Sequence, residues 1–257
     1  MALSCPQPSD YQPLSCQACA KGTALGFDFS MAFQPIVNMA ERKVVGYEAL
    51  CRGLNGESAG SVIAQVNDSN LYRFDQTCRV KAITLAAELD IKGYVSINFL
   101  PNAVYRPELC IRTTLEAAEK YGFPAERIVF EITEVERVGD KNHLRNIIDY
   151  YQKSGFRTAL DDFGAGYAGL NMLAAFQPDI VKIDRELIEH LDTQPVKQTI
   201  VRHLLNLCRD LNITPLAEGV ETVEEYRVLR DFGVSLFQGY LFARPEFESL
   251  PEVSWPE

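Results

Sequence analysis

Two neighbouring aspartates, Asp161 and Asp162, are the residues whose types and spacing point most directly to chemistry. They follow the apolar run 158–160 and precede a glycine-rich stretch, within the segment RTALDDFGAGYAGL at 157–170. Adjacent side chains inside a strand point to opposite faces, but just past a strand's end both can turn toward one point. Two carboxylates held together repel unless one takes up a proton or a divalent cation lies between them. A solvated Asp-Gly turn is the alternative for this segment taken alone.

The surrounding sequence alternates apolar runs with helix-like segments, a pattern that predicts parallel strands joined by crossover helices. The first two expected strands are joined by a turn too short for a crossover, so this pair is expected to be antiparallel. The length of 257 residues is close to the ~250 that an α/β barrel takes. We therefore predict an α/β fold, a (β/α)8 TIM-like barrel with the first strand antiparallel, over residues 30–257. The expected strands lie near 31–37, 43–52, 94–99, 127–133, 157–160, 180–183, 214–217 and 235–238.

Polar residues are expected at the carboxyl ends of these strands, which is where the chemistry of such barrels is carried out. Each one alone has an ordinary explanation: Asn98 could cap a turn, Glu131 could be an exposed acid, and Lys182 could reach solvent. Acids, amides and a lysine at successive strand ends are hard to explain as coincidence. Oxygen ligands without histidine suit Mg²⁺ or Mn²⁺ better than Zn²⁺. The set is Glu48, Asn98, Glu131, Asp161, Asp162, Lys182, Glu218 and Gln238.

These residues stand in motifs that follow one another along the chain: GYEALCR at 46–52, Asn98, EITE at 131–134, DDFGAGYAGL at 161–170, KID at 182–184, AEGVE at 217–221 and FQGY at 237–240. Over residues 31–247 the chain resembles the EAL family of cyclic-di-GMP phosphodiesterases. The resemblance implies hydrolysis of cyclic di-GMP to linear pGpG by water that two divalent cations, Mg²⁺ or Mn²⁺, activate. It also implies a role in bacterial signalling and a homodimer. Ca²⁺ tolerates irregular coordination and is expected to bind the same site and inhibit.

The resemblance also implies roles for individual positions. One cation would be held by Glu48, Asn98, Glu131 and Asp161, and the other by Asp161, Asp162 and Glu218, with Asp161 bridging the two. The catalytic group would consist of Glu48, Asp161, Asp162, Lys182 and Gln238. In it, Lys182 would position or deprotonate the attacking water and Gln238 would orient groups near it.

Further positions of the resemblance bind the substrate or support the site. The substrate contacts would be Gln34, Leu50, Arg52 and Asp75, of which Arg52 suits a phosphate oxygen and Asp75 a guanine edge. The residues that support the loop after Asp162 would be Glu134 and Glu221.

The chain departs from the family's usual pattern in three places. Cys51-Arg52-Gly53 replaces a bulkier run after EAL, the cysteine-bearing arm at residues 1–29 lies outside the family core, and GAGYAGL at 164–170 stands where GTGYSSL is more usual. The alanines of this loop lack hydroxyls that could brace it, which bears on the rate and its coupling to dimerisation. Two rival readings stay open: a catalytically silent cyclic-di-GMP receptor or protein-interaction module, and a different metal-dependent phosphoesterase on the same barrel.

Charge and composition exclude some classes of partner. The formal net charge of -10 argues against binding a DNA or RNA polymer, which requires a basic surface. Acids that hold cations can still make one pocket locally positive, so a phosphate substrate is not excluded. The longest apolar runs fall short of the ~18 residues of a membrane span, and the first residues lack the features of a signal peptide. A cytoplasmic protein is the expectation.

Three of the seven cysteines lie in the predicted irregular arm at residues 1–29, namely Cys5, Cys16 and Cys19. Cys16 and Cys19 form a C-x-x-C pair, which can hold zinc or cycle as a dithiol. Together with Cys5 they supply three thiolates, so a Zn²⁺ site needs a fourth ligand from elsewhere. An arm that is merely packed or exposed is the alternative.

Overall fold

A computed structural model of the chain describes residues 25–104, 106–133, 141–166 and 169–257. Residues 1–24 of the expected arm, with its three cysteines, and Glu134 lie outside these residues. The strands are β1 (Ser30–Asn38), β2 (Lys43–Arg52), β3 (Tyr94–Asn98), β4 (Ile128–Thr133), β5 (Arg157–Phe163), β6 (Ile180–Ile183), β7 (Thr214–Ala217), β8 (Leu236–Phe237) and β9 (Glu246–Phe247). The α-helices are α2 (Ala59–Ile63), α3 (Leu71–Glu88), α4 (Pro107–Cys110), α5 (Arg112–Tyr121), α6 (Lys141–Lys153), α7 (Gly169–Ala175), α8 (Arg185–Ile188), α9 (Pro195–Asp210) and α10 (Val223–Asp231). Short 3₁₀ turns are η2 (Pro101–Ala103) and η3 (Ala125–Arg127).

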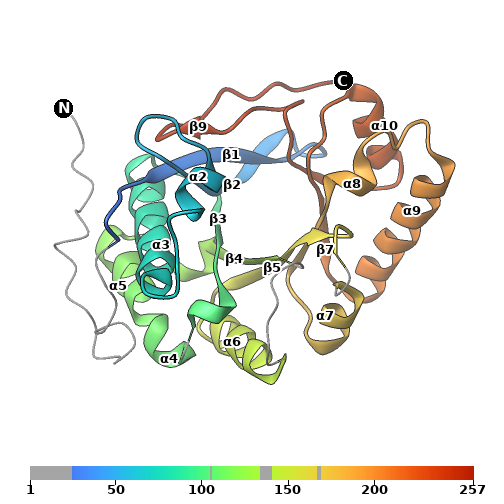
Figure 1. Ribbon diagram of the computed structural model, residues 1–257. Coiled ribbons are helices and arrows are strands. Elements are labelled where there is room, and N and C mark those ends of the chain that lie inside the picture. The colour runs from blue at the N-terminus through green and yellow to red at the C-terminus, as the bar shows by residue number, and fades with distance from the viewer. Residues whose placement is uncertain (1–24, 105, 134–140, 167–168) are drawn as a thin grey trace.

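Strands β1 to β8 close into a barrel with helices around its outside (Figure 1). Strands β2 to β8 are parallel to their neighbours, whereas β1 is antiparallel to both β2 and β8. The predicted barrel with an antiparallel first strand is therefore confirmed. Strand β9 was not expected and adds to β1 at Ala32 and Phe33.

Strand β1 changes partner along one edge. It pairs with β9 at Ala32 and Phe33 and with β8 at Val37 and Asn38. Pro35 lies between these two pairings, so the residue without a backbone N–H coincides with the break in the ladder.

One layer of buried apolar side chains fills part of the barrel interior. Strands β1 and β3 to β8 each contribute one of them, and Val45 of β2 packs against the layer. Gly46 leaves room for the ring of Tyr94, which would otherwise lie 2.6 Å from a Cβ at position 46. The layer consists of Ile36, Tyr94, Val129, Ala159, Ile180, Leu216 and Leu236.

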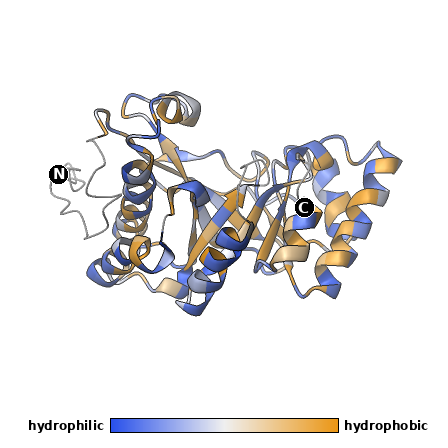
Figure 2. Ribbon diagram, turned by 60° about the horizontal axis from the view of Figure 1, so that its bottom comes forward, coloured by the Kyte–Doolittle hydropathy of each residue, from blue (hydrophilic) through white to orange (hydrophobic). Residues whose placement is uncertain are grey.

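Two larger apolar clusters fill the space between the barrel and its helices. Figure 2 shows mostly apolar strands at the centre and helices whose blue residues face outward. Leu25 and Phe29, which precede β1, are buried in the first of these clusters. None of the helices in the described part of the chain is long and apolar enough to cross a membrane.

Candidate active site

The polar residues of the predicted set lie directly above the apolar layer. On β4, β5 and β6 a buried polar residue follows the layer residue by two positions, giving Glu131, Asp161 and Lys182. Glu218 and Gln238 stand in the same relation to the layer residues of β7 and β8. Because side chains two apart point to the same face of a strand, the apolar and polar residues form two successive layers inside one barrel. The alternation of side chains along each strand thus brings the acids to one end of the barrel.

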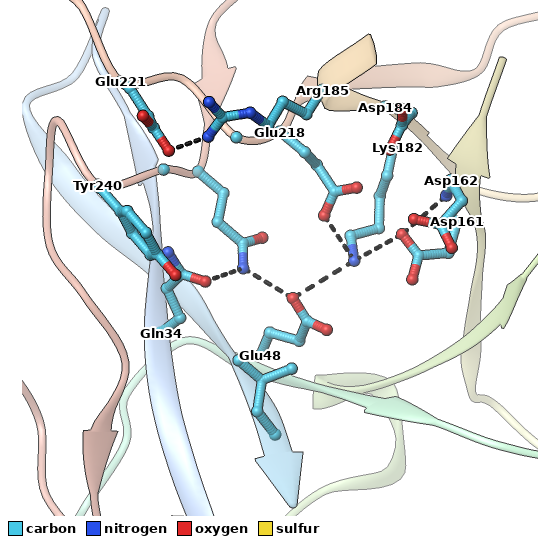
Figure 3. A pocket seen from close by; sticks show the side chains of 14 residues that line it. Gln34, Glu48, Asp161, Asp162, Lys182, Asp184, Arg185, Glu218, Glu221 and Tyr240 are labelled. Atoms are coloured by element: carbon cyan, nitrogen blue, oxygen red, sulfur yellow. Dashed lines mark hydrogen bonds and ion pairs between the residues drawn. The ribbon is translucent and has the colours of Figure 1, made fainter. Parts of the chain in front are cut away.

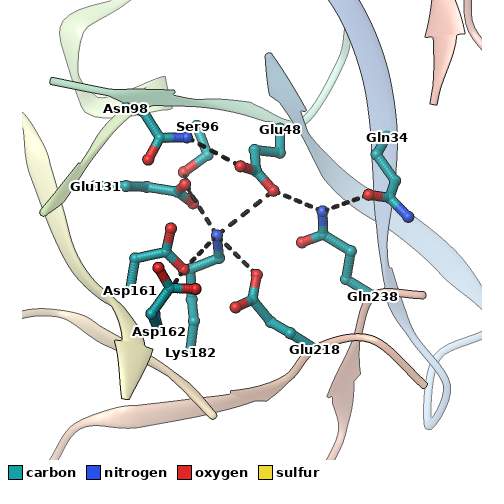
Figure 4. Close-up of polar contacts among 10 residues, drawn as sticks. All are labelled: Gln34, Glu48, Ser96, Asn98, Glu131, Asp161, Asp162, Lys182, Glu218 and Gln238. Atoms are coloured by element: carbon teal, nitrogen blue, oxygen red, sulfur yellow. Dashed lines mark hydrogen bonds and ion pairs between the residues drawn. The ribbon is translucent and has the colours of Figure 1, made fainter. Parts of the chain in front are cut away.

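Lys182 lies at the centre of the polar layer and is 1% exposed. Its Nζ lies 2.7 Å from Glu218 Oε1, 2.9 Å from Glu131 Oε2 and 2.9 Å from Asp161 Oδ1. A fourth carboxylate oxygen, Glu48 Oε2, is 3.4 Å away. Figure 4 shows these four carboxylates converging on the ammonium group, from β2, β4, β5 and the residue that follows β7.

Two amides hold Glu48 in place. Asn98 Nδ2 donates to Glu48 Oε1 at 3.0 Å, and Gln238 Nε2 donates to Glu48 Oε2 at 2.7 Å. Gln238 Nε2 also contacts Gln34 Oε1 at 3.1 Å. Because Asn98 uses its NH₂ group on Glu48, its amide oxygen is the atom that can bind a cation.

Asp162 reaches the same site through a bulge in β5. The strand runs on to Phe163, and not only to Leu160 as the sequence suggested, but its pairing with β6 shifts between Leu160 and Phe163. Asp162 has a positive φ of 53°, which aspartate tolerates better than most residues, and its N–H donates to Asp161 Oδ1 at 3.0 Å. The bulge breaks the alternation that would otherwise send adjacent aspartates to opposite faces.

The site carries more negative charge than its lysine neutralises. With every group ionised, five carboxylates (Glu48, Glu131, Asp161, Asp162, Glu218) and one ammonium leave four negative charges. Burial raises the pKa of Glu131 and Glu218 well above the usual range, and neighbouring carboxylates add to the rise. Burial together with Asp161 and Asp184 raises the pKa of Asp162 to about 6. Burial would lower the pKa of Lys182, but the carboxylates around it raise it on balance.

The donor set fits two divalent cations. Carboxylate oxygens of Glu48, Glu131 and Asp161 all lie within 4.8 Å of one another, and so do those of Asp161, Asp162 and Glu218. Asp161 belongs to both groups, and all the donors are hard oxygens of the kind that Mg²⁺ and Mn²⁺ prefer. The surplus negative charge is what such ions would balance.

An open pocket of about 300 Å³ gives access to this end of the barrel. Gln34 and Leu50, two of the expected substrate contacts, line it together with all the site's acids except Glu131, and Glu221 lies on its wall (Figure 3). Three side chains that the sequence analysis did not assign also line it, namely Asp184, Arg185 and Tyr240. Asp184 and Tyr240 fall inside motifs that the sequence displayed, KID and FQGY, so motif membership was the available signal.

Arg185 connects two walls of this pocket. Its guanidinium pairs with Glu221 and, at 3.1 Å, with Glu189. The central guanidinium carbon of Arg244 lies 4.1 Å from the ring centre of Tyr240, a residue that is 48% exposed.

Two of the expected substrate contacts do not line the pocket. Arg52 Nη1 donates to the carbonyl of Cys51 at 2.7 Å, and Asp75 is buried with Arg79 and the backbone of Leu100 as partners. Glu134, expected to support the loop after Asp162, lies outside the described residues.

Comparison with known proteins agrees with this geometry. The EAL domain family matches residues 22–245. The blue light- and temperature-regulated antirepressor BluF of Escherichia coli (strain K12) is 31% identical over 241 residues, which cover 93% of this chain and 59% of BluF. The probable cyclic di-GMP phosphodiesterase PdeD of the same organism is 28% identical over 228 residues, covering 85% of this chain and 42% of PdeD. This chain thus spans less than two thirds of either relative.

Solved structures share the fold over nearly the whole chain. A standalone versatile EAL protein from Vibrio cholerae O395, in its c-di-GMP bound form, has a TM-score of 0.88 and 60% identity, covering 90% of this chain and 98% of that one. Klebsiella pneumoniae BlrP1, in a manganese/cy-diGMP complex at pH 9.0, has a TM-score of 0.84 and 34% identity, covering 95% of this chain and 60% of that one. Together with the family match over residues 22–245, this shows that the chain belongs to the EAL domain family.

Proposed function

We propose that this protein is a cyclic-di-GMP phosphodiesterase that uses two divalent cations, Mg²⁺ or Mn²⁺, to open the cyclic substrate to linear pGpG. The observation that carries the proposal is the pair of carboxylate clusters that share Asp161, most of whose members line an open pocket. Support comes from the Vibrio cholerae and Klebsiella pneumoniae neighbours, both of which were solved with the cyclic dinucleotide.

The reaction is an in-line displacement at phosphorus. A water oxygen forms a bond to phosphorus, one bridging P–O bond breaks, and the released oxygen leaves as a ribose hydroxyl. Bound cations supply Lewis acidity, which stabilises charge on the phosphoryl oxygens and makes water a stronger nucleophile. Glu48, Asn98, Glu131 and Asp161 would hold one cation, and Asp161, Asp162 and Glu218 the other.

The chain's own residues then fix the geometry. The ammonium of Lys182 holds four carboxylates within 3.4 Å and provides an N–H donor at the point where they meet. Gln238 fixes the orientation of Glu48 through its 2.7 Å hydrogen bond. Such pre-positioning lowers the barrier because the groups need not reorganise during the reaction.

Substrate contacts, metal preference and assembly complete the proposal. Gln34 and Leu50 line the pocket and are proposed to contact the dinucleotide, and Arg52 is proposed to reach a phosphate oxygen by leaving the carbonyl of Cys51. Ca²⁺ is proposed to occupy the site without supporting turnover, because its irregular coordination positions the reacting groups poorly. The protein is proposed to act as a homodimer in the cytoplasm.

A binding role without catalysis is the second candidate. The relative BluF is named an antirepressor, a function that requires no hydrolysis. In that case the dinucleotide would bind this pocket and control a protein partner.

Product analysis separates the two candidates. The protein is incubated with cyclic di-GMP and Mn²⁺, with or without chelator, and the mixture is resolved by chromatography. Linear pGpG that forms only without chelator is the expected result. Intact cyclic di-GMP in both samples, with the dinucleotide bound, would establish the receptor instead.

A further inference from the structure

Arg79 of helix α3 is a fully buried cation outside the pocket. It is 0% exposed, and its Nη2 lies 2.5 Å from Oδ2 of Asp75 one turn earlier on the helix. Its Nη1 donates to the hydroxyl of Tyr151 on α6 at 3.0 Å. A buried guanidinium loses its hydration, so these contacts are what make the position tolerable.

Three aromatic rings surround the same guanidinium. Its central carbon lies 5.5 Å from the ring centre of Phe99, 5.1 Å from that of Phe130 and 5.7 Å from that of Tyr151. The rings of Phe130 and Tyr151 are themselves 4.9 Å apart. Cation–π attraction of this kind strengthens when water is excluded.

Two of these rings are next to proposed cation ligands along the chain. Phe99 follows Asn98 at the end of β3, and Phe130 precedes Glu131 on β4. Because neighbouring residues on a strand point to opposite faces, the rings pack outward against α3 and α6 while their neighbours face the barrel interior. Asn98 and Glu131 are also register partners, and Phe99 N–H donates to Glu131 O at 3.2 Å.

Asp75 adds a direct bond to the backbone beyond β3. Its Oδ1 accepts from Leu100 N–H at 2.9 Å, two residues after Asn98. The ion pair therefore fixes the backbone at Leu100, two residues after Asn98. The stacked rings fix the chain at Phe130, the residue before Glu131.

We propose that Asp75, Arg79 and Tyr151 form a positioning unit behind the barrel wall that sets the ends of β3 and β4, and so fixes Asn98 and Glu131 for cation binding. The inference deepens the proposed function and rests on it. It assigns Asp75 a place behind the wall, where the sequence analysis expected a contact to a guanine edge.

Mn²⁺ binding without substrate tests this directly. Mn²⁺ is added to the parental chain and to an Asp75→Leu/Arg79→Met double variant, and the concentration of free Mn²⁺ is measured from its electron paramagnetic resonance signal. Replacing a buried ion pair by apolar side chains of similar size often leaves stability unchanged, whereas losing one partner leaves a buried charge. We expect two Mn²⁺ equivalents in the parental chain and about tenfold or greater weakening of one of them in the double variant.

Glu218→Gln identifies which equivalent is affected. This change removes the second cation group, so one Mn²⁺ should remain, held by Glu48, Asn98, Glu131 and Asp161. Adding the double substitution to Glu218→Gln should weaken that remaining Mn²⁺. Tyr151→Phe, which removes only the hydroxyl that accepts from Arg79, should show a smaller loss in the same direction and decides the question if the double variant does not fold.

Asp28→Asn is the matched control. It disrupts a second ion pair of helix α3, from Lys81 Nζ to Asp28 Oδ1 at 3.0 Å, in which the Lys81 side chain is 5% exposed and that of Asp28 is 35% exposed. The Lys81 ammonium lies over the ring of Phe29. Mn²⁺ binding should stay parental in this control. Equal weakening in control and double variant would mean a general loosening of α3 and would overturn the inference.

Turnover adds a readout that a purely structural role would not move. At limiting Mn²⁺ the double variant should lose kcat, and saturating Mn²⁺ should restore it with KM for cyclic di-GMP unchanged. A raised KM at saturating Mn²⁺ would instead support the guanine contact for Asp75 and overturn the inference. Parental chain that binds no Mn²⁺ would refute the proposed function, whereas two parental equivalents that the double variant leaves unchanged would refute only the positioning role.

Discussion

Replacing Lys182 with methionine keeps most of the side chain's volume and removes the one ammonium of the polar layer. In chelated protein, the carboxylates that the ammonium contacts at 2.7 to 3.4 Å then face one another without a counter-charge. Removing one partner of a buried ion pair costs roughly 3–5 kcal/mol. In a chain of this size each kcal/mol moves the thermal midpoint by about 2–4 °C, so a loss of roughly 10 °C is expected.

The size of this loss should depend on pH. Burial already raises the pKa of Glu131 and Glu218 in the folded protein, and removing Lys182 raises it further. An acid with a raised folded pKa contributes stability at pH values below its unfolded pKa, near 4.3 for glutamate, and this contribution is lost as the pH rises toward the folded pKa. The gap between variant and parental midpoints should therefore be larger at pH 8 than at pH 5.5.

Mn²⁺ should reverse the loss. Cations that bind only the folded state stabilise it by mass action, by about 2.7 kcal/mol at one hundred times the Kd. Because cations in the variant replace the missing counter-charge, Mn²⁺ should raise its midpoint by more than that of the parental chain.

Thermal melts followed by circular dichroism, in chelator and in Mn²⁺ at both pH values, measure these effects. Lys92→Met is the control, since Lys92 is exposed and pairs with exposed Asp90. A Lys182→Met variant that melts at the parental temperature in chelator at pH 8 would refute the view that the ammonium balances the carboxylates.

Three further predictions concern the cations. Asp161→Asn removes a charge from both carboxylate clusters, so pGpG formation should fall by about 1,000-fold or more, while binding of cyclic di-GMP in Ca²⁺ should change far less. Near-parental turnover, measured by chromatography, would contradict a bridging role. Glu218→Gln should reduce the Mn²⁺ stoichiometry measured by paramagnetic resonance from two to one, and two equivalents in the variant would remove Glu218 from the ligand set. Ca²⁺ added to the Mn²⁺-supported reaction should suppress turnover in competition with Mn²⁺, and a full rate with Ca²⁺ alone would show that coordination geometry does not limit the reaction.

The alternation of side chains along a strand made the inward-facing part of the site predictable. An acid or a lysine two positions beyond an apolar strand residue is expected on the same face, as Glu131 and Lys182 show. The order of strand ends around a parallel barrel then brings such residues together without any knowledge of the loops.

Asp162 and Asp75 show where that reasoning stops. Asp162 faces the site because of a bulge and a positive φ, and a bulge depends on pairing between two strands that a local pattern does not contain. Asp75 pairs with Arg79 one turn along the same helix, a spacing that the sequence contains, but its bond to the N–H of Leu100 beyond β3 joins two elements. The bulge at Asp162 and this bond both depend on contacts between elements, which residue spacing does not reveal.

The reversed first strand explains why Gln34 belongs to the site, and it couples the site to barrel closure. On β1, Gln34 comes two positions before Ile36 of the apolar layer, whereas on the other strands the polar residue comes after the layer residue. The reason is that β1 runs opposite to its neighbours, so its earlier residues lie toward the site. Strands β1 and β8 share only two residue pairs, Val37 with Phe237 and Asn38 with Leu236. The 3.1 Å bond from Gln238 to Gln34 spans this same seam one layer higher. The amide that orients Glu48 thus also links the first and eighth strands, so weakening the seam should disturb the site before the rest of the barrel.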